Sequence, residues 1–526
     1  MAVDPISLEV FKNLFVSVAE EMGVALGRTA YSPNIKERRD YSCAVFNPAG
    51  EMVAQAAHIP VHLGAMPASV QAAVAQHTLQ PGDIVVLNDP YLGGTHLPDI
   101  TLVGPVFVEQ QGKRVLAGFV ANRGHHADIG GMTPGSLPLS TELYQEGFII
   151  PPIKLARRGR LNQEVIALLC RNSRTPEERK GDLAAQIAAI RVGERRLQEV
   201  VARYGLEVTH EHMAALLDYS ERMTRAAVRR IPEGQYQYTD FMDDDGLSDE
   251  PVPITVTVTV REDSLEFDFT GTAAQRPGCI NAPFAVTVSA VLYVVRCIVG
   301  ENVPANSGCL RPVRVRAPEG TLVNPKPQGG VAGGNVETSQ RITDVLLGAL
   351  AQALPDLIPA ASQGTMNNLL IGGHDPIRDK PFVYYETIAG GMGARPTKDG
   401  VSGIHTHMTN TMNTPIEALE FVYPLRMLKY LIRRGSGGAG QHRGGDGVVR
   451  ELEFLAPARV TIISERRRRA PYGLQGGQPG QRGENVLLKG GVEEVRLPPK
   501  VTLDAAQGDV LSMRTPGGGG WGKPRE

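Results

Sequence analysis

Histidines and a carboxylate stand at the ends of two apolar segments in the first quarter of the chain. His96 and Asp99 precede the first of these segments, and the pair His125-His126 follows the second. Imidazole and carboxylate groups together are typical ligands of zinc, manganese or iron. These residue types therefore predict a site for one divalent metal ion, provided that the fold brings the two ends together.

The two apolar segments are expected to be the strands of one hairpin. Both are rich in β-branched residues, and the polar link between them contains glycine. With a turn centred near Gln111, antiparallel pairing sets Asp99 opposite about Gly124, so that the ligand types meet at the open end. A slip of one residue would exchange which of His125 and His126 points toward the site. The pairing alone leaves that choice open.

A second carboxylate is expected to complete the ligand set. Asp40 is the favoured fourth ligand, because another negative charge would offset the charge of a dication. The alternative for the whole group is that its members cap strands and form hydrogen bonds to loops. That interpretation suits a single histidine better than several histidines that converge with a carboxylate.

Other polar residues near this group have more than one interpretation. Asp128 could orient a ligating imidazole, act as a general base on water at the metal, or cap the turn that follows it. His126 is a second candidate for an orienting or acid–base role. His58 and His62 have the spacing of a helical metal pair, but Pro60 between them argues against a helix. We expect a pocket or structural role for that second pair.

The composition is that of an ordinary globular protein. Of 526 residues, 42% are hydrophobic and 21% are charged, and the net charge of -2 predicts no general attraction to nucleic acid or to an anionic membrane. No apolar run approaches the ~20 residues of a membrane helix. The odd number of cysteines, without a C-x-x-C pair, favours reduced thiols. With no secretory signal evident at the N-terminus, we expect a cytoplasmic protein.

The periodicity predicts an α+β (mixed α/β) fold. We expect a β-rich, multi-domain chain with mostly antiparallel sheets, because strict alternation of apolar and polar residues begins after Pro232. The predicted units are an N-terminal α/β metal-binding domain, a central α+β domain and a C-terminal β-rich, Gly-rich region: 1–234, 235–435 and 436–526. Several amphipathic helices are also predicted: 6–28, 66–78, 175–204, 210–230, 284–300 and 337–354.

Two other segments could contact a ligand or a partner. The segments 390–395 and 405–410 combine glycines with polar side chains, which suits a loop that faces the substrate or another subunit. Neither has the setting of a dinucleotide site or a P-loop, so we predict no nucleotide site in this chain. The arginine run 466–469 is typical of a solvated face, with contact to an acidic partner as the alternative.

Several of these segments closely resemble the hydantoinase B/oxoprolinase family. That family comprises the B-type subunits of ATP-dependent hydantoin and lactam hydrolases, and it is related to one subunit of the acetone and acetophenone carboxylases. The resemblance covers essentially the whole chain. The segments that carry it are 40–43, 58–66, 88–99, 125–131, 181–186, 443–448 and 515–520.

The resemblance implies a specific ligand set and a division of labour. The implied metal ligands are Asp40, His96, Asp99 and His125, which selects the first histidine of the pair. A partner A-type subunit with an actin/sugar-kinase-like fold would bind ATP-Mg and phosphorylate the substrate oxygen. The chain described here would then complete ring opening with the help of one manganese, zinc or iron ion.

The expected function is therefore that of a metal-dependent B-type subunit in a hetero-oligomeric, ATP-dependent cyclic amide hydrolase of hydantoinase or 5-oxoprolinase type. One alternative is a subunit of an ATP-dependent acetone- or acetophenone-type carboxylase. A second alternative is a non-catalytic scaffold that stabilises its partner.

Overall fold

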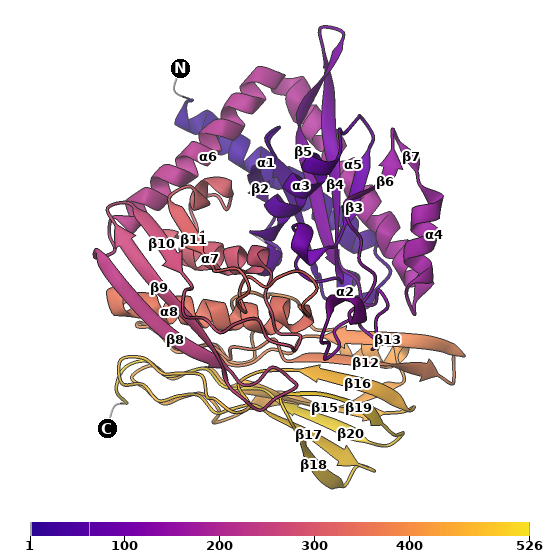
Figure 1. Cartoon of the computed structure of the whole chain (residues 1–526), viewed down its shortest axis with the longest axis vertical. Helices are drawn as coiled ribbons and strands as arrows, with labels where there is room; N and C mark the ends of the chain where they lie inside the picture. The colour runs from indigo at the N-terminus through magenta and orange to yellow at the C-terminus, as the bar shows by residue number, and fades with distance from the viewer. Residues whose placement is uncertain (1–2, 63, 525–526) are drawn as a thin grey trace.

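The computed structural model describes residues 3–62 and 64–524, which form four sheets and the helices packed on them (Figure 1). The predicted fold class is confirmed: helices and strands are mixed, and the sheets are mostly antiparallel. Among the described residues, no helix unites the length and the apolar character that crossing a bilayer would need.

The first sheet carries the predicted hairpin at its centre. Its seven strands lie in the order β2-β1-β5-β4-β3-β6-β7. Their bounds are β1 Tyr41–Phe46, β2 Met52–Gln55, β3 Ile84–Leu87, β4 Asp99–Gln110, β5 Lys113–His125, β6 Ile153–Arg157 and β7 Arg160–Leu161. The halves of β4 and β5 that lie away from the turn are buried, because helices cover both faces of the sheet.

Helices α1 and α5 cover one face of the first sheet, and α3 covers the other. Their bounds are α1 Pro5–Thr29, α3 Ala65–Gln76 and α5 Pro176–Tyr204. In α1, Phe11, Phe15 and Met22 recur at helical spacing and are all buried, and Asp4 caps the first turn by accepting a hydrogen bond from Ser7 N at 2.9 Å. The three helices predicted in this part of the chain are therefore confirmed.

The central part of the chain builds a four-stranded sheet in the order β11-β10-β9-β8, with α8 packed on β8 and β9. The strands are β8 Gly234–Met242, β9 Val252–Arg261, β10 Ser264–Asp268 and β11 Val313–Arg316. The remaining helices are α2 Pro33–Lys36, α4 Gln163–Arg171, α6 Leu206–Val228, α7 Phe284–Val299, α8 Ser339–Ala353 and α9 Ile416–Val422. Burial alternates along most of β9, which is the half-buried pattern expected from its sequence.

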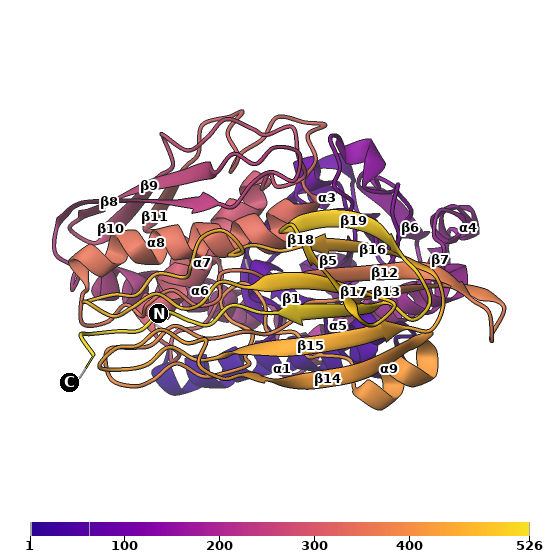
Figure 2. The same ribbon diagram turned by 90° about the horizontal axis from the view of Figure 1, so that it is seen from below.

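The C-terminal strands form two sheets that share one hydrophobic core (Figure 2). One has the order β13-β12-β16-β19 and the other β14-β15-β20-β17-β18. The bounds are β12 Asn368–Asp375, β13 Lys380–Glu386, β14 Leu425–Arg433, β15 Gly447–Phe454, β16 Ala458–Ile463, β17 Glu484–Lys489, β18 Glu493–Leu497, β19 Lys500–Ala505 and β20 Val510–Arg514. Both sheets combine strands from before and after residue 435, and the three-domain division stays a prediction.

Only the end of the arginine run 466–469 is the solvated face that its composition suggested, because Arg468 and Arg469 are exposed and the first residue is not. Arg466 is buried and lies between Asp240 and Asp344, with N–O distances of 2.8 and 2.5 Å. The backbone N–H groups of the next three residues donate to the carboxylate of Asp243. The acidic partner of this run is thus the central part of the same chain.

The central hairpin differs by one residue from its predicted register. The turn falls at 111–112 as expected, but Asp99 pairs with His125 and not with Gly124. Side chains of directly opposed residues lie on the same face of an antiparallel sheet. Asp99 and His125 therefore point to the same side.

A β-bulge in β5 causes this shift. Val106 pairs with Gly118, whereas Phe107 pairs with Leu116, so that β5 contains one residue more than β4 at this point. A Cβ atom at Gly118 would lie 2.3 Å from the carbonyl oxygen of Phe46 on β1. Only glycine fits this approach, and the bulge therefore depends on it.

We expect Gly118→Val to destabilise the protein by about 2 kcal/mol or more, because the new side chain would push β5 away from β1. The thermal unfolding midpoint measures the loss. Arg114→Ala, at an exposed position of the same hairpin, is the control and should stay close to the unchanged protein. Equal midpoints for the two variants would contradict the role assigned to the bulge.

Candidate functional site

His96, Asp99 and His125 converge at the open end of the β4–β5 hairpin, as the sequence predicted. Asp99 Oδ1 lies 3.3 Å from His96 Nε2 and 3.2 Å from His125 Nδ1, and these two ring nitrogens are 3.2 Å apart. One potential ligand atom of each residue lies within 4.8 Å of the others. All three side chains are buried.

The geometry of this cluster suits a shared cation. Asp99 Oδ1 approaches two imidazoles closely, yet it is buried without a hydrogen-bond partner among residues 3–62 and 64–524. Buried polar atoms are nearly always hydrogen-bonded, so an orphaned carboxylate oxygen between two ring nitrogens needs an explanation. Two nitrogen donors and one carboxylate oxygen form a set that a zinc, manganese or iron ion could accept.

His62 joins this group, which the sequence interpretation did not foresee. Its Nε2 lies 3.4 Å from Asp99 Oδ2, and its Nδ1 is 2.8 Å from the hydroxyl of Ser42. A 3₁₀ turn, Pro60–His62, presents the ring to the site. His58 turns elsewhere and accepts a hydrogen bond from Cys43 N. The four-residue spacing had suggested a histidine pair, but only His62 reaches the site.

Asp40 lies next to the cluster without entering it. Its backbone oxygen accepts a hydrogen bond from His125 N at 3.0 Å, and its carboxylate is 4.0 Å from Arg38 Nη2. The group of closely spaced ligand atoms contains His96, Asp99 and His125 but not Asp40 among the described residues. Its place as the fourth ligand stays a prediction.

His126 points away from the cluster and toward α5. Its Nε2 lies 2.9 Å from Gln186 Oε1, and Gln186 in turn donates hydrogen bonds to Ile100 O and to the side chain of Asn122. Burial lowers the pKa of His126 to about 3. This network ties the ends of β4 and β5 to α5 and so holds the hairpin that carries the cluster.

Asp128 organises a loop. Its carboxylate accepts hydrogen bonds from the backbone N–H groups of Gly130, Gly135 and Arg174 and pairs with the Arg174 guanidinium at 2.9 Å. This is the turn-capping alternative that the sequence also allowed. Both His126 and Asp128 thus form their hydrogen bonds outside the cluster. Their predicted acid–base roles stay predictions.

Residues far along the chain close the site from the other side. Asn335 donates to Asp99 Oδ2 at 3.3 Å, together with the hydroxyl of Thr95. The ring of Tyr385 stacks on His125 with centroids 4.7 Å apart. No sequence pattern pointed to Asn335 or Tyr385, because their relation to the hairpin arises only from the packing of later segments.

A buried carboxyl group positions His96. Glu146 Oε1 accepts hydrogen bonds from the backbone N–H groups of Val331 and Ala332, at 2.7 and 3.0 Å. The carbonyl oxygen of Ala332 lies 3.5 Å from His96 Nδ1, which leaves Nε2 facing Asp99. Burial raises the pKa of Glu146 to about 7.

The electrostatics favour the protonation states that ligate a metal. Burial alone would raise the pKa of Asp99, but the nearby His96 and His62, together with the close approach of His125, hold it well below its ordinary value. Burial lowers the pKa of His125, so its imidazole is neutral at neutral pH. The Asp99 carboxyl is therefore ionised and the His125 ring is neutral, which are the forms of these two groups that bind a cation.

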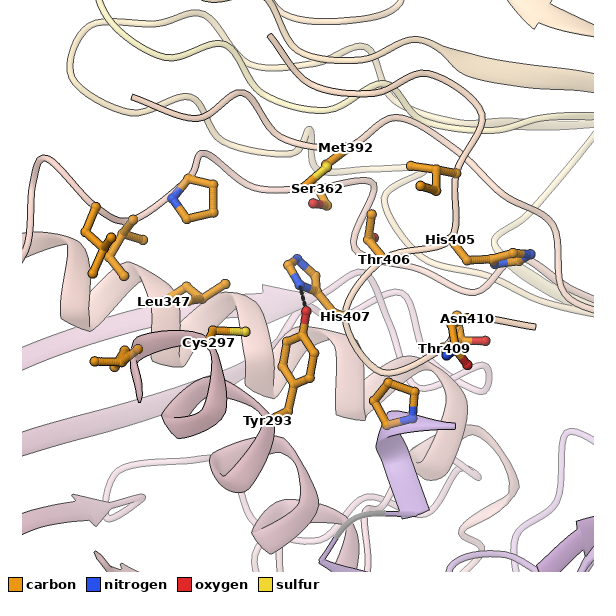
Figure 3. Close-up of a pocket in the computed structure, with 16 residues that line it drawn as sticks. Tyr293, Cys297, Leu347, Ser362, Met392, His405, Thr406, His407, Thr409 and Asn410 are labelled. Atoms are coloured by element: carbon orange, nitrogen blue, oxygen red, sulfur yellow. Dashed lines mark hydrogen bonds between the residues drawn. The ribbon is translucent and has the colours of Figure 1, made fainter. Parts of the chain in front are cut away.

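The predicted loops 390–395 and 405–410 line a cavity of about 410 Å³ (Figure 3). His405 is one of its lining residues, and both ring nitrogens lack a hydrogen-bond partner among the described residues. Burial lowers the pKa of His405 to about 3, with a smaller contribution from Arg38. That these loops face a substrate or a subunit stays a prediction.

Comparison with known proteins is consistent over the whole chain. The sequence profile of the hydantoinase B/oxoprolinase family matches residues 4–524. The chain is 41% identical to 5-oxoprolinase 1 of Arabidopsis thaliana over 99% of its own length, but it spans only 42% of that protein. It is 35% identical to a candidate B-type subunit of a D-/L-hydantoinase from Pseudomonas sp. (strain NS671), covering 100% of this chain and 91% of that one.

A solved structure is also similar. The ATP-dependent caprolactamase of Pseudomonas jessenii superposes with a TM-score of 0.92 at 30% identity, covering 99% of this chain and 92% of the caprolactamase chain. The likeness therefore extends over all the sheets described above.

The buried neutral imidazole of His405 predicts a pH effect on stability. Below about pH 6.5 the unfolded chain gains a proton at this histidine, and the folded chain does not until about pH 3, so stability falls as the pH falls through that window. At pH 4.5, His405→Phe should retain on the order of 2 kcal/mol that the unchanged protein loses. Thermal unfolding at pH 7.5 and 4.5 measures this difference. Equal losses in both proteins would contradict it, and His374→Phe, at an exposed position, is the control.

Proposed function

This chain belongs to the hydantoinase B/oxoprolinase family, and from that premise we propose that it is the metal-dependent B-type subunit of a cytoplasmic, ATP-dependent cyclic amide hydrolase of hydantoinase or 5-oxoprolinase type. The observation that carries the proposal is the buried cluster of His96, Asp99 and His125. The sequence of this chain contains no P-loop, and the cluster would give it a catalytic role that does not depend on binding ATP.

The share of each relative's length that the chain covers supports the existence of a separate partner subunit. The chain matches nearly all of a protein whose name marks it as the B-type subunit of a hydantoinase, but less than half of a 5-oxoprolinase. In this proposal a separate A-type subunit supplies what the chain lacks: it binds ATP-Mg and phosphorylates the amide oxygen of the substrate. The two subunits then form a hetero-oligomer.

The metal would be held by His96 Nε2, His125 Nδ1 and a carboxylate oxygen of Asp99, with His62 and Asp40 as candidates for the next position. A manganese, zinc or iron ion bound there would polarise the amide carbonyl and lower the pKa of a water molecule. Thr95 and Asn335 hold the other oxygen of Asp99, and Tyr385 fixes the plane of the His125 ring. The protein groups thereby orient the ligands before a substrate arrives.

The chemistry explains why two activities are needed. An unstrained amide resists water, because its carbonyl carbon is a weak electrophile and its oxygen is a poor leaving group. Phosphorylation of that oxygen at the partner changes both properties. A first water adds to the activated carbon and the ring C–N bond breaks, which moves a proton to the ring nitrogen and leaves a free amine and an acyl phosphate. A second water then displaces phosphate, which departs with the former amide oxygen, and the product is the ring-opened amino acid.

Metal content tests the ligand set directly. We expect His96→Ala and His125→Ala to reduce metal affinity at least about 10- to 100-fold, which is the scale seen even for residues that only orient ligands. Elemental analysis of the chain purified with its partner gives the readout. His374→Ala is the control, because His374 is exposed and lies on β12, outside the cluster. A full metal complement in both cluster variants would contradict the assignment of His96 and His125 as metal ligands.

The choice between His62 and Asp40 has a separate test. His62 Nε2 already lies 3.4 Å from Asp99, whereas the Asp40 carboxylate is engaged near Arg38. We therefore expect His62→Ala to weaken metal binding more than Asp40→Asn does. The reverse order would restore Asp40 as the fourth ligand.

Turnover by the assembled enzyme tests the whole proposal. With its partner, the chain should support ATP-dependent ring opening of a cyclic amide, and His96→Ala should reduce it by about 100-fold or more while ATP binding to the partner persists. ATP hydrolysis that requires bicarbonate and a ketone would favour the carboxylase alternative. Full turnover by a metal-free complex would favour the scaffold alternative.

A further inference from the structure

Arg38 is a buried cation without a carboxylate in close contact. Its side chain has no solvent exposure, and its one ion-pair partner within residues 3–62 and 64–524, the carboxylate of Asp40, is 4.0 Å away. Burying an ionised group costs free energy unless hydrogen bonds and nearby charges compensate it. The groups that surround the guanidinium therefore indicate what this side chain does.

The guanidinium of Arg38 contacts three residues that each contact His125 in turn. Asn34 and Asp40 precede β1, and Tyr385 lies on β13. His125 presents its Nδ1 atom to the cluster from the end of β5. Three separate routes thus connect Arg38 to this one predicted metal ligand.

The first route runs through Asn34 to the backbone of His125. Arg38 Nη1 donates a hydrogen bond to the side-chain oxygen of Asn34, and Asn34 Nδ2 donates to the carbonyl oxygen of His125 at 2.6 Å. A guanidinium can only donate and a carbonyl oxygen can only accept, so the amide group of Asn34 has a single orientation that satisfies both. Arg38 therefore fixes the direction in which Asn34 holds the end of β5.

The second route runs through Tyr385 to the ring of His125. The guanidinium carbon of Arg38 lies over the Tyr385 ring, 4.8 Å from its centroid. The imidazole of His125 stacks on the same tyrosine ring, with centroids 4.7 Å apart and planes 19° from parallel. Arg38 Nη1 also donates to the carbonyl oxygen of Tyr385 at 3.0 Å. Both the ring and the backbone of the residue that supports the imidazole are thus held by Arg38.

The third route runs through Asp40. The backbone N–H of His125 donates to the carbonyl oxygen of Asp40 at 3.0 Å, and the Asp40 side chain faces the guanidinium. The N–H and the C=O of His125 are therefore both bonded to residues that Arg38 contacts.

We propose that Arg38 is a positioning residue of the metal site, whose planar guanidinium fixes the ring and the backbone of His125 so that Nδ1 faces the ion. The inference rests on the proposed function, because it needs His125 to be a metal ligand. The charge of Arg38 would have the opposite effect, since a cation near the site repels a dication and its removal would tighten metal binding. Positioning and charge therefore predict opposite results.

Two variants separate these effects. Arg38→Lys keeps the positive charge but lacks the planar fork of donors that reaches several partners at once. Arg38→Met removes both the charge and the donors. Arg426→Lys is the matched control, at an exposed position on β14 where the side chain pairs only with Glu453 in the described part of the chain.

The experiment measures binding of Co²⁺ to the full chain by visible absorption, whose bands report the ligands and the geometry of the ion. The partner is left out, so that no nucleotide site takes up the ion. We expect Arg38→Lys and Arg38→Met each to weaken Co²⁺ binding by about 10-fold and to shift the absorption bands, because groups that orient ligands act on this scale. Arg426→Lys should change neither. Unchanged affinity and bands in both Arg38 variants, or tighter binding in Arg38→Met, would overturn the inference.

A merely structural role of Arg38 would give a different result. It would lower the thermal unfolding midpoint of the metal-free chain, but the affinity and the absorption bands of the folded chain would stay as they are. That outcome would also overturn the inference.

Failure of the proposed function is read separately, through His96→Ala and through turnover. Full Co²⁺ affinity in His96→Ala would contradict the metal site and the role of Arg38 together. Loss of the ion in His96→Ala, with full affinity in both Arg38 variants, would contradict the role of Arg38 alone. Weakened binding in the Arg38 variants of a chain whose complex opens no cyclic amide would contradict the hydrolase and leave the positioning role standing.

Discussion

The carboxylate of Asp99 lies at the end of β4 without solvent exposure, among three imidazoles. Burying an ionised group costs free energy unless its neighbours compensate. One of its oxygens receives hydrogen bonds from Thr95 and Asn335, and the other faces ring nitrogens and forms no hydrogen bond within the described part of the chain. The bulge at Gly118, the 3₁₀ turn that carries His62 and the π-helical turn Gly334–Thr338 before α8 all supply parts of this environment. The folding of three separate regions is thus constrained by one buried charge.

Periodicity and residue type predicted much of the fold and the central residues of the site. The helices around Phe11 and after Thr175, the hairpin turn near Gln111 and the meeting of His96 with Asp99 follow from local patterns. The exact pairing of Asp99 did not, because the apolar pattern does not fix where a bulge lies, and Gly118 within the second strand was the local signal of one. Contacts from Asn335 and Tyr385 depend on packing between segments more than two hundred residues apart. Arg466 was misjudged for the same reason, since composition does not reveal a buried acidic partner.

A buried ion pair links the cavity lined by the loops 390–395 and 405–410 to the docking of the C-terminal sheets. Asp344 on α8 pairs with Arg466, which follows β16, and its other oxygen faces His407, which lines the cavity. Breaking a buried pair leaves an uncompensated charge and is strongly destabilising. The position of His407 is therefore coupled to the packing of the C-terminal sheets against the central part of the chain.

The pairing of β12 with β16, and of β16 with β19, has a consequence for synthesis on the ribosome. Tyr385 lies on β13, the outer neighbour of β12, and its sheet is completed only when β19, Lys500–Ala505, has been synthesised. The hairpin with His96, Asp99 and His125 is made hundreds of residues earlier. A nascent chain thus presents these three side chains to the surrounding solution before Asn335 and Tyr385 reach them. In the finished fold both later residues lie against the cluster.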